Sequence, residues 1–198
     1  MRIPNVLVLL ALASPAIAAE VGQPAPEFTL TDLDGKVHRL SDHKGKIVVL
    51  EWFNPSCPFV ANSHTKGSLV GTPGRFEKTG VVWLAINSSA PGKQGHGVES
   101  SRAAAKRWSL DYPILLDASG AIGKAYGATN TPHIFVIGKD GKLAYKGAVD
   151  NSPDGERASP QGGVLVDYVT AALDDLAAGR PVHTAETKAY GCSVKYAH

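Results

Sequence analysis

The sequence predicts an α/β fold, and three segments carry that prediction. Residues 47–53 form an almost continuous apolar run that only Glu51 interrupts, as expected of a strand covered on both faces of a sheet. Residues 81–86 form a second apolar run of this kind. Residues 164–176 place their apolar side chains three and four positions apart, which is the spacing of an amphipathic helix. Buried strands combined with amphipathic helices are typical of the α/β class.

The remaining elements follow from turn residues and periodicity. Asp34-Gly35 and Asp140-Gly141 are turn signals that join extended segments into hairpins. The glycines and the proline between residues 67 and 74 end the helix before them. The other expected elements are a hairpin over 28–40, helices over 57–66, 98–108 and 118–126, an extended piece over 112–116, and strands over 132–137 and 143–149.

The first nineteen residues have the pattern of a secretory signal peptide. A positive start at Met1-Arg2 precedes an apolar segment over 6–12, and small residues follow up to Ala18 and Ala19. The alternative is an uncleaved membrane anchor, but the apolar segment is shorter than a bilayer span requires. We therefore expect cleavage after Ala18 or Ala19, a periplasmic or secreted mature protein, and no membrane insertion after cleavage.

The remaining chain is long enough for one domain with a single core, which we place at residues 20–180, followed by a C-terminal tail over 181–198. The formal net charge is +2, and no basic block predicts a nucleic-acid partner. Two cysteines are too few for a fold built on disulfides, although two cysteines in an exported chain favour a pair.

Cys57 is the residue that most strongly indicates chemistry. It follows Asn54-Pro55-Ser56 at the point where a buried strand gives way to a helix. The unpaired N–H groups and the positive end of the dipole at a helix N-terminus favour the thiolate, which is the nucleophilic form. The alternative is a buried core cysteine. Val60 stands where a dithiol motif has its second cysteine, so Cys57 acts alone or with Cys192, 135 positions away.

Two motifs resemble the thioredoxin superfamily. The first is the strand that ends in Trp52-Phe53, followed by a short turn and Cys57-Pro58. The second is Thr131-Pro132, which leads into the strand over 133–137. In that superfamily, a Thr-Pro with a cis peptide bond faces the active cysteine.

Three further segments resemble a narrower group, the peroxiredoxin-like branch of the alkyl hydroperoxide reductase/thiol-specific antioxidant (redoxin) proteins. They are residues 54–60, 86–93 and 191–196. The resemblance implies a thioredoxin-like fold, with a central mixed sheet flanked by helices, an N-terminal hairpin and a C-terminal tail that carries Cys192. It also implies an exported thiol oxidoreductase, in which Cys57 attacks a disulfide or a peroxide.

The resemblance implies roles for several other residues. Cys192 is the candidate resolving thiol, within one chain or between two chains, with an accidental terminal thiol as the alternative. The remaining candidates line the substrate groove: Asn54, Pro58, Thr131 and Pro132. Glu51 corresponds to a buried carboxylate that assists proton transfer, and burial disfavours its charged form. A Glu51 paired with a lysine, or in contact with solvent at the strand end, is the other interpretation.

Two departures from the family limit the implied activity. Peroxiredoxins have proline seven residues and threonine or serine three residues before their cysteine, where this chain has Leu50 and Asn54. The hydroxyl that positions peroxide is therefore missing, which counts against an antioxidant peroxidase. Thiol–disulfide exchange with a protein or small-thiol electron donor is the first expectation, with a disulfide or peroxide as substrate.

A non-catalytic periplasmic binding or metal-chaperone module on the same fold is the alternative function. The spacing of the seven histidines matches no known metal site. Residues 90–93 resemble a phosphate-binding loop only superficially, because Gln94 stands where serine or threonine is needed. We therefore expect neither a metal nor an organic cofactor.

Overall fold

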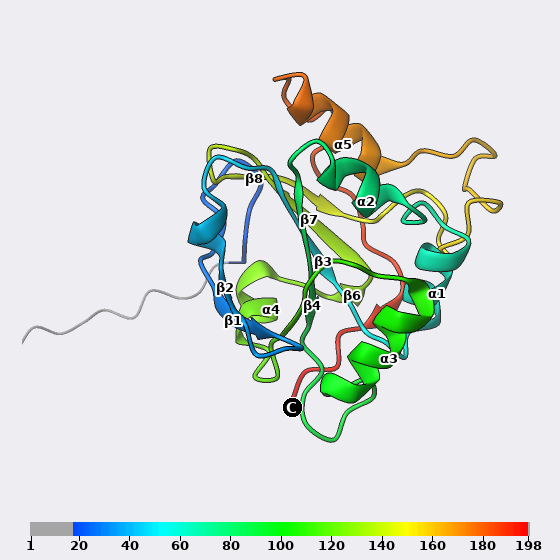
Figure 1. Cartoon of the computed structure of the whole chain (residues 1–198). Helices are drawn as coiled ribbons and strands as arrows, with labels where there is room; N and C mark the ends of the chain where they lie inside the picture. Colours follow the sequence, from blue (N-terminus) through cyan, green and yellow to red (C-terminus); the bar gives the residue numbers. More distant parts are fainter. Residues whose placement is uncertain (1–17, 198) are drawn as a thin grey trace, which may run out of the picture.

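The computed structural model describes residues 18–197. The expected signal peptide, residues 1–19, lies outside the described residues except for its last two positions. A seven-stranded mixed sheet crosses the molecule, with the strand order β2-β1-β5-β4-β3-β7-β8 (Figure 1). Its strands are β1 (Thr29–Asp32), β2 (Val37–Arg39), β3 (Val48–Trp52), β4 (Val82–Asn87), β5 (Ile114–Leu116), β7 (His133–Ile137) and β8 (Leu143–Gly147).

A second, two-stranded sheet consists of β6 (Asn130–Thr131) and β9 (Cys192–Ser193). The helices are α1 (Pro58–Thr65), α2 (Thr72–Glu77), α3 (Val98–Trp108), α4 (Ala121–Tyr126) and α5 (Tyr168–Ala177), with a 3-10 turn η1 over Leu40–His43. No helix within residues 18–197 combines the length and apolar character needed to cross a membrane. The predicted α/β fold, with its mixed sheet, flanking helices and N-terminal hairpin β1–β2, is confirmed.

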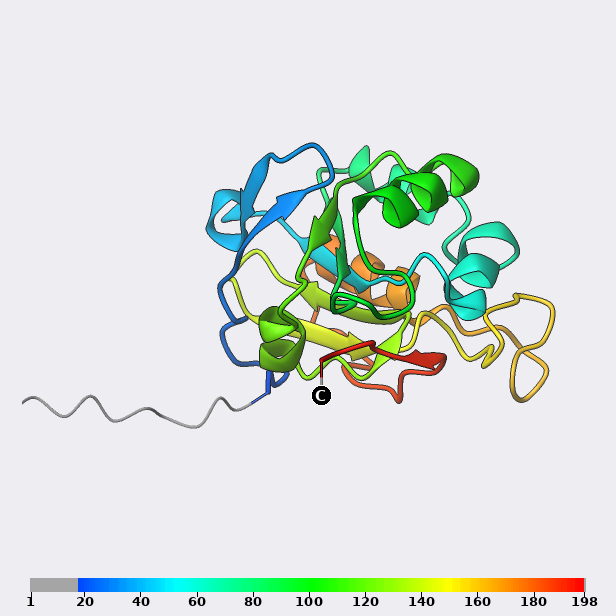
Figure 2. The same cartoon turned by 90° about the horizontal axis from the view of Figure 1, so that it is seen from below.

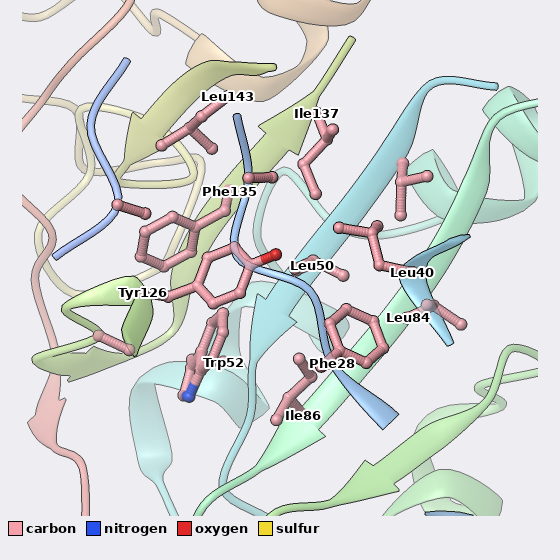
Figure 3. Packing of buried hydrophobic residues seen from close by; sticks show 14 of the residues in the cluster. Phe28, Leu40, Leu50, Trp52, Leu84, Ile86, Tyr126, Phe135, Ile137 and Leu143 are labelled. Atoms are coloured by element: carbon pink, nitrogen blue, oxygen red, sulfur yellow. The ribbon is translucent and has the colours of Figure 1, made fainter. Parts of the chain in front are cut away.

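Strand β3 lies inside the sheet, pairing parallel with β4 and antiparallel with β7, and all five of its residues are buried. Because side chains alternate along a strand, Leu50 and Trp52 point to one face, while Val49 and Glu51 point to the other. Leu50 and Trp52 belong to a core that includes Tyr126 of α4 and Phe135 of β7 (Figure 3). The Trp52 and Phe135 ring centroids lie 5.0 Å apart.

The opposite face of the sheet is covered by α1, α2, α3 and α5 (Figures 1 and 2). Val169 and Leu173 of α5 are fully buried against this face, together with Val49 and Val136. Nearer α1 and α3, the core contains Phe53, Val60, Ala85, Ala104, Ile114 and Cys57. Glu51 and Cys57 therefore lie on the helix-covered face of the sheet.

The helices differ from the sequence prediction in three places: α2 was not predicted, and α4 and α5 begin later than expected, α4 at Ala121 instead of 118. The segment 67–74 ends α1 as expected, but it also contains the start of α2 at Thr72. Pro73 is tolerated in the first turn of that helix because the N–H it lacks would have no helical partner there. Helix α5 begins at Tyr168 instead of 164, since the Asp167 carboxylate accepts a hydrogen bond from the Thr170 N–H and caps the helix.

The C-terminal tail returns across the domain (Figure 2). It first runs beside β8, where Lys146 and Glu186 form a parallel bridge. It then reaches the loop before β7, where β9 pairs antiparallel with β6. The sequence showed no period in this segment, because its order depends on pairing with residues far away in the chain.

Candidate active site around Cys57

Cys57 is the N-cap residue of α1. The chain leaves β3 and turns at Asn54, whose side-chain oxygen accepts a hydrogen bond from the Ser56 N–H at 2.8 Å. The Cys57 N–H donates to the Asn54 carbonyl at 3.1 Å, and Pro58 occupies the first helical position. This local sequence therefore places the thiol at the helix N-terminus, as predicted.

The peptide bond between Thr131 and Pro132 is cis. Thr131 lies in β6, and its carbonyl accepts a hydrogen bond from the Cys57 thiol at 3.1 Å. The fold thus brings together residues that are 74 positions apart. Cys57 and Thr131 are 2% and 1% exposed, so the thiol lies below the surface in this arrangement.

Cys192 lies directly opposite Thr131 in the antiparallel pair of β6 and β9. Both cysteines are free thiols, and Cys192 packs against the buried cluster that contains Cys57. Burial, together with the neighbouring Cys57 thiol, raises the pKa of Cys192 to about 11. Cys192 is therefore protonated at neutral pH and half-buried, while Cys57 is the more deeply placed of the two.

Glu51 is completely buried on β3, and three side chains form hydrogen bonds with its carboxyl group. His64 Nε2 lies 2.7 Å from Oε1, while Trp83 Nε1 and the Tyr112 hydroxyl lie 3.1 and 3.2 Å from Oε2. Burial and the Glu51 charge raise the pKa of Tyr112 well above its usual range, so Tyr112 stays a donor. The carboxylate contacts neither a lysine partner nor solvent, and none of these hydrogen bonds reaches Cys57.

Sequence reasoning missed the donors around Glu51. His64 had a usable signal, because it follows Cys57 by two helical turns and so lies on the same side of α1. Its ring also stacks on Trp108 of α3, with centroids 5.9 Å apart. Trp83 and Tyr112 offered no such signal, since only the parallel pairing of β3 with β4, and of β4 with the strand β5 that follows Tyr112, brings them to Glu51.

The predicted groove residues have different surroundings. Asn54 is buried, and its Nδ2 donates to Ser89 Oγ at 3.3 Å and to the Gln94 carbonyl at 3.1 Å. Its side chain therefore holds the loop over 88–97 in place. Pro58 is exposed at the start of α1. Within residues 18–197, no group of three histidine, cysteine or acidic side chains could hold a metal ion.

A mixed sheet with a cysteine at a helix N-terminus, facing a cis-proline, defines the class of this protein: a thiol oxidoreductase of thioredoxin-like fold. The profile of the redoxin family matches residues 20–161, and the chain belongs to that family. The predicted membership of the redoxin group is therefore confirmed.

The chain is similar in sequence to a thiol-disulfide oxidoreductase, and similar in structure to two solved proteins. The chain is 35% identical over 127 residues to the thiol-disulfide oxidoreductase ResA of Geobacillus thermodenitrificans, a match that covers 64% of this chain and 68% of ResA. An uncharacterized conserved protein from Geobacillus kaustophilus has a similar structure, with a TM-score of 0.78 and 33% identity over 90% of this chain and 93% of that one. A hypothetical protein from Sinorhizobium meliloti has a TM-score of 0.79 and 26% identity, over 91% and 97% of the two chains.

Proposed function

We propose that this protein is an exported thiol–disulfide oxidoreductase that cycles between a Cys57–Cys192 dithiol and an intramolecular disulfide. The observation that carries the proposal is the position of Cys192, which lies opposite Thr131 and packs against the cluster that contains Cys57, although the two cysteines are 135 positions apart in the sequence. Only a tail that folds back to β6 produces this arrangement. The signal-peptide pattern of residues 1–19 supports export to the periplasm or the medium.

The proposed exchange starts at Cys57. Cys57 first gives its thiol proton to the solvent, which supplies a proton to the second substrate sulfur when that sulfur is released. The Cys57 thiolate attacks one sulfur of a substrate disulfide, and the other sulfur leaves as a thiolate. That thiolate takes the proton of Cys192, and the Cys192 sulfur then attacks Cys57 and releases the second substrate thiol. The substrate gains two electrons and two protons, and the protein becomes a disulfide. An external thiol, on a protein or a small molecule, returns it to the dithiol.

Surrounding residues have supporting roles in this proposal. The Thr131 carbonyl accepts the Cys57 S–H and holds the thiol at the groove formed with Pro58 and Pro132. We assign Glu51 to proton handling beneath α1, through its hydrogen bonds to His64 and Tyr112. Peroxide reduction is the weaker candidate, because Asn54 provides no hydroxyl beside Cys57 and its amide is bound to the 88–97 loop.

The test is glutathione disulfide exchange followed by peptide mapping without reduction. The wild-type protein is expected to yield one Cys57–Cys192 peptide from within a single chain. Cys192→Ser is expected to accumulate a glutathione adduct on Cys57, because nothing resolves it, and Cys57→Ser to form no early adduct. Ser193→Ala, which changes an exposed neighbour in β9, is the matched control and is expected to behave like the wild type.

Three results would contradict the proposal. The first is no exchange at Cys57, and the second is a Cys57–Cys57 bridge between chains as the main product. The third is oxidation of Cys57 by hydrogen peroxide much faster than by glutathione disulfide, which would favour the peroxidase instead.

A further inference from the structure

The C-terminal segment runs directly over Cys57. A Cβ atom placed on Gly191 would lie 2.2 Å from the Thr131 carbonyl oxygen and 3.4 Å from Phe59 Cβ. Phe59 belongs to the first turn of α1 and Thr131 to β6, so the Gly191 backbone fills the space between the two elements that flank Cys57. Only glycine fits here, because φ is +104° and the approach to the Thr131 backbone is so close.

Non-covalent contacts hold this segment on both sides of Gly191. The segment is residues 190–197, and we call it the cover. Before Gly191, the Tyr190 hydroxyl donates to Asp150 Oδ1 at 3.0 Å. After it, the Val194 N–H donates to the Thr129 carbonyl at 3.0 Å, and the Tyr196 hydroxyl to the Ala128 carbonyl at 2.8 Å.

The tail has a separate attachment upstream of the cover. The Thr187 N–H donates to the Lys146 carbonyl at 3.1 Å, and the Thr187 hydroxyl bonds to the Tyr145 hydroxyl at 2.7 Å. Lys188, between this attachment and the cover, is exposed. Residues 190–197 can therefore lift away while residues 185–187 stay on β8.

The closed arrangement also leaves polar groups unsatisfied. Within the described part of the chain, Thr131 Oγ1 and Asp150 Oδ2 are buried without a hydrogen-bond partner. Both residues contact the cover, through Cys192 opposite Thr131 and through Tyr190. Lifting the cover lets water reach both atoms, which lowers the free-energy cost of opening.

We propose that residues 190–197 are a displaceable cover that controls access to Cys57. The inference rests on the proposed function, since it concerns the same thiol pair. In the reduced protein the cover is held by non-covalent contacts alone, which also include the β6–β9 pairing, the Asn130 and Ala90 hydrogen bonds to its backbone and the packing of Val194, so it opens transiently and admits a partner to Cys57. In the oxidised protein the Cys57–Cys192 disulfide ties the cover down. Reduction of that bond therefore restores both the nucleophile and the access to it.

The test measures how fast iodoacetamide alkylates Cys57 in the full-length reduced protein, on a Cys192→Ser background that leaves one thiol. Adding Gly191→Ala is expected to raise the rate about tenfold or more, because a cover that is mostly closed reduces the observed rate by its open fraction. The matched control is Gly162→Ala. Gly162 also has a positive φ, +80°, but nothing lies within 4 Å of its added Cβ, so the rate is expected to stay unchanged.

A second variant keeps the test decisive if Gly191→Ala does not fold. Tyr190→Phe with Tyr196→Phe removes two hydroxyl contacts of the cover and keeps both rings, and it is expected to raise the rate by a smaller factor. Equal alkylation rates in the Cys192→Ser background and in both cover variants would overturn the proposal. Alkylation needs no exchange partner, so this result would not decide whether Cys57 and Cys192 form a redox pair. Peptide mapping tests that pair separately.

Discussion

Glu51 shows how one buried residue can serve both stability and chemistry. Three donors satisfy its carboxylate in an apolar interior, and each of them comes from a different element or loop. Loss of one partner leaves a buried charge short of a hydrogen bond, which is costly in a low-dielectric interior. We assign Glu51 to proton handling because it is bonded to His64 of α1, the helix that carries Cys57 at its N-terminus.

The variant Glu51→Gln distinguishes a structural role of Glu51 from a role in proton handling. If Glu51 handles protons, the variant is expected to slow reduction of the oxidised protein by dithiothreitol about tenfold or more, and to change the shape of the rate profile between about pH 5 and 9. Trp83→Phe is the control, since it removes one donor and leaves the carboxylate in place. A purely structural Glu51 would give both variants a lower free energy of unfolding and the wild-type pH profile.

At the scale of elements, helix ends and short strands position the site more than the long central strands do. Cys57 is the N-cap residue of helix α1, and the two-residue strand β6 places the Thr131 carbonyl beside the Cys57 thiol. The tail is held by an equally short strand, β9. Helix α5 depends on a single capping residue, Asp167, whose Oδ2 also accepts from the Thr170 hydroxyl at 2.8 Å.

Asp167→Ala is expected to lower the free energy of unfolding by about 1 kcal/mol, the usual cost of losing a helix N-cap. Burial raises the pKa of Asp167, so on acidification the folded protein takes up this proton before the unfolded chain does, and the difference between wild type and variant is expected to grow. Urea unfolding of the wild type and the variant, at neutral and at acid pH, measures this difference in the free energy of unfolding. Asp174→Ala, an exposed site in the same helix, is the control, and an equal loss there would contradict the capping role.

At the scale of the whole molecule, the stability of the fold depends on keeping the buried His133 neutral. His133 lies in β7, where its ring packs 4.4 Å from that of Phe135 and its Nδ1 accepts from the Thr129 N–H. Burial, with a smaller effect of Lys146, lowers the pKa of His133 from 6.5 to about 4. Between these values the unfolded chain binds a proton that the folded chain does not, so acidification favours unfolding.

His133 alone is expected to reduce the free energy of unfolding by about 2 kcal/mol between about pH 7.5 and pH 5. His133→Gln is expected to remove most of this loss, and the smaller effect of His43, whose pKa is also lowered by burial, remains. Urea unfolding of both proteins at the two pH values measures the difference. The exposed His183 provides the control His183→Gln. An acid sensitivity that is the same in His133→Gln as in the wild type would show that other groups cause it.

The sequence by itself determined the α/β class, the central strand, the cysteine at a helix N-terminus and, through resemblance, the cis-proline that faces it. These features are local: apolar runs, turn residues and caps act over a few positions, so a short stretch of residues is enough to specify them. Only the tertiary structure decided the partners of Glu51, the pairing of β9 with β6 and the packing of Cys192 against the cluster that contains Cys57. Each of these joins segments far apart in the chain, and packing of the complete core, which no single segment encodes, sets their relative positions.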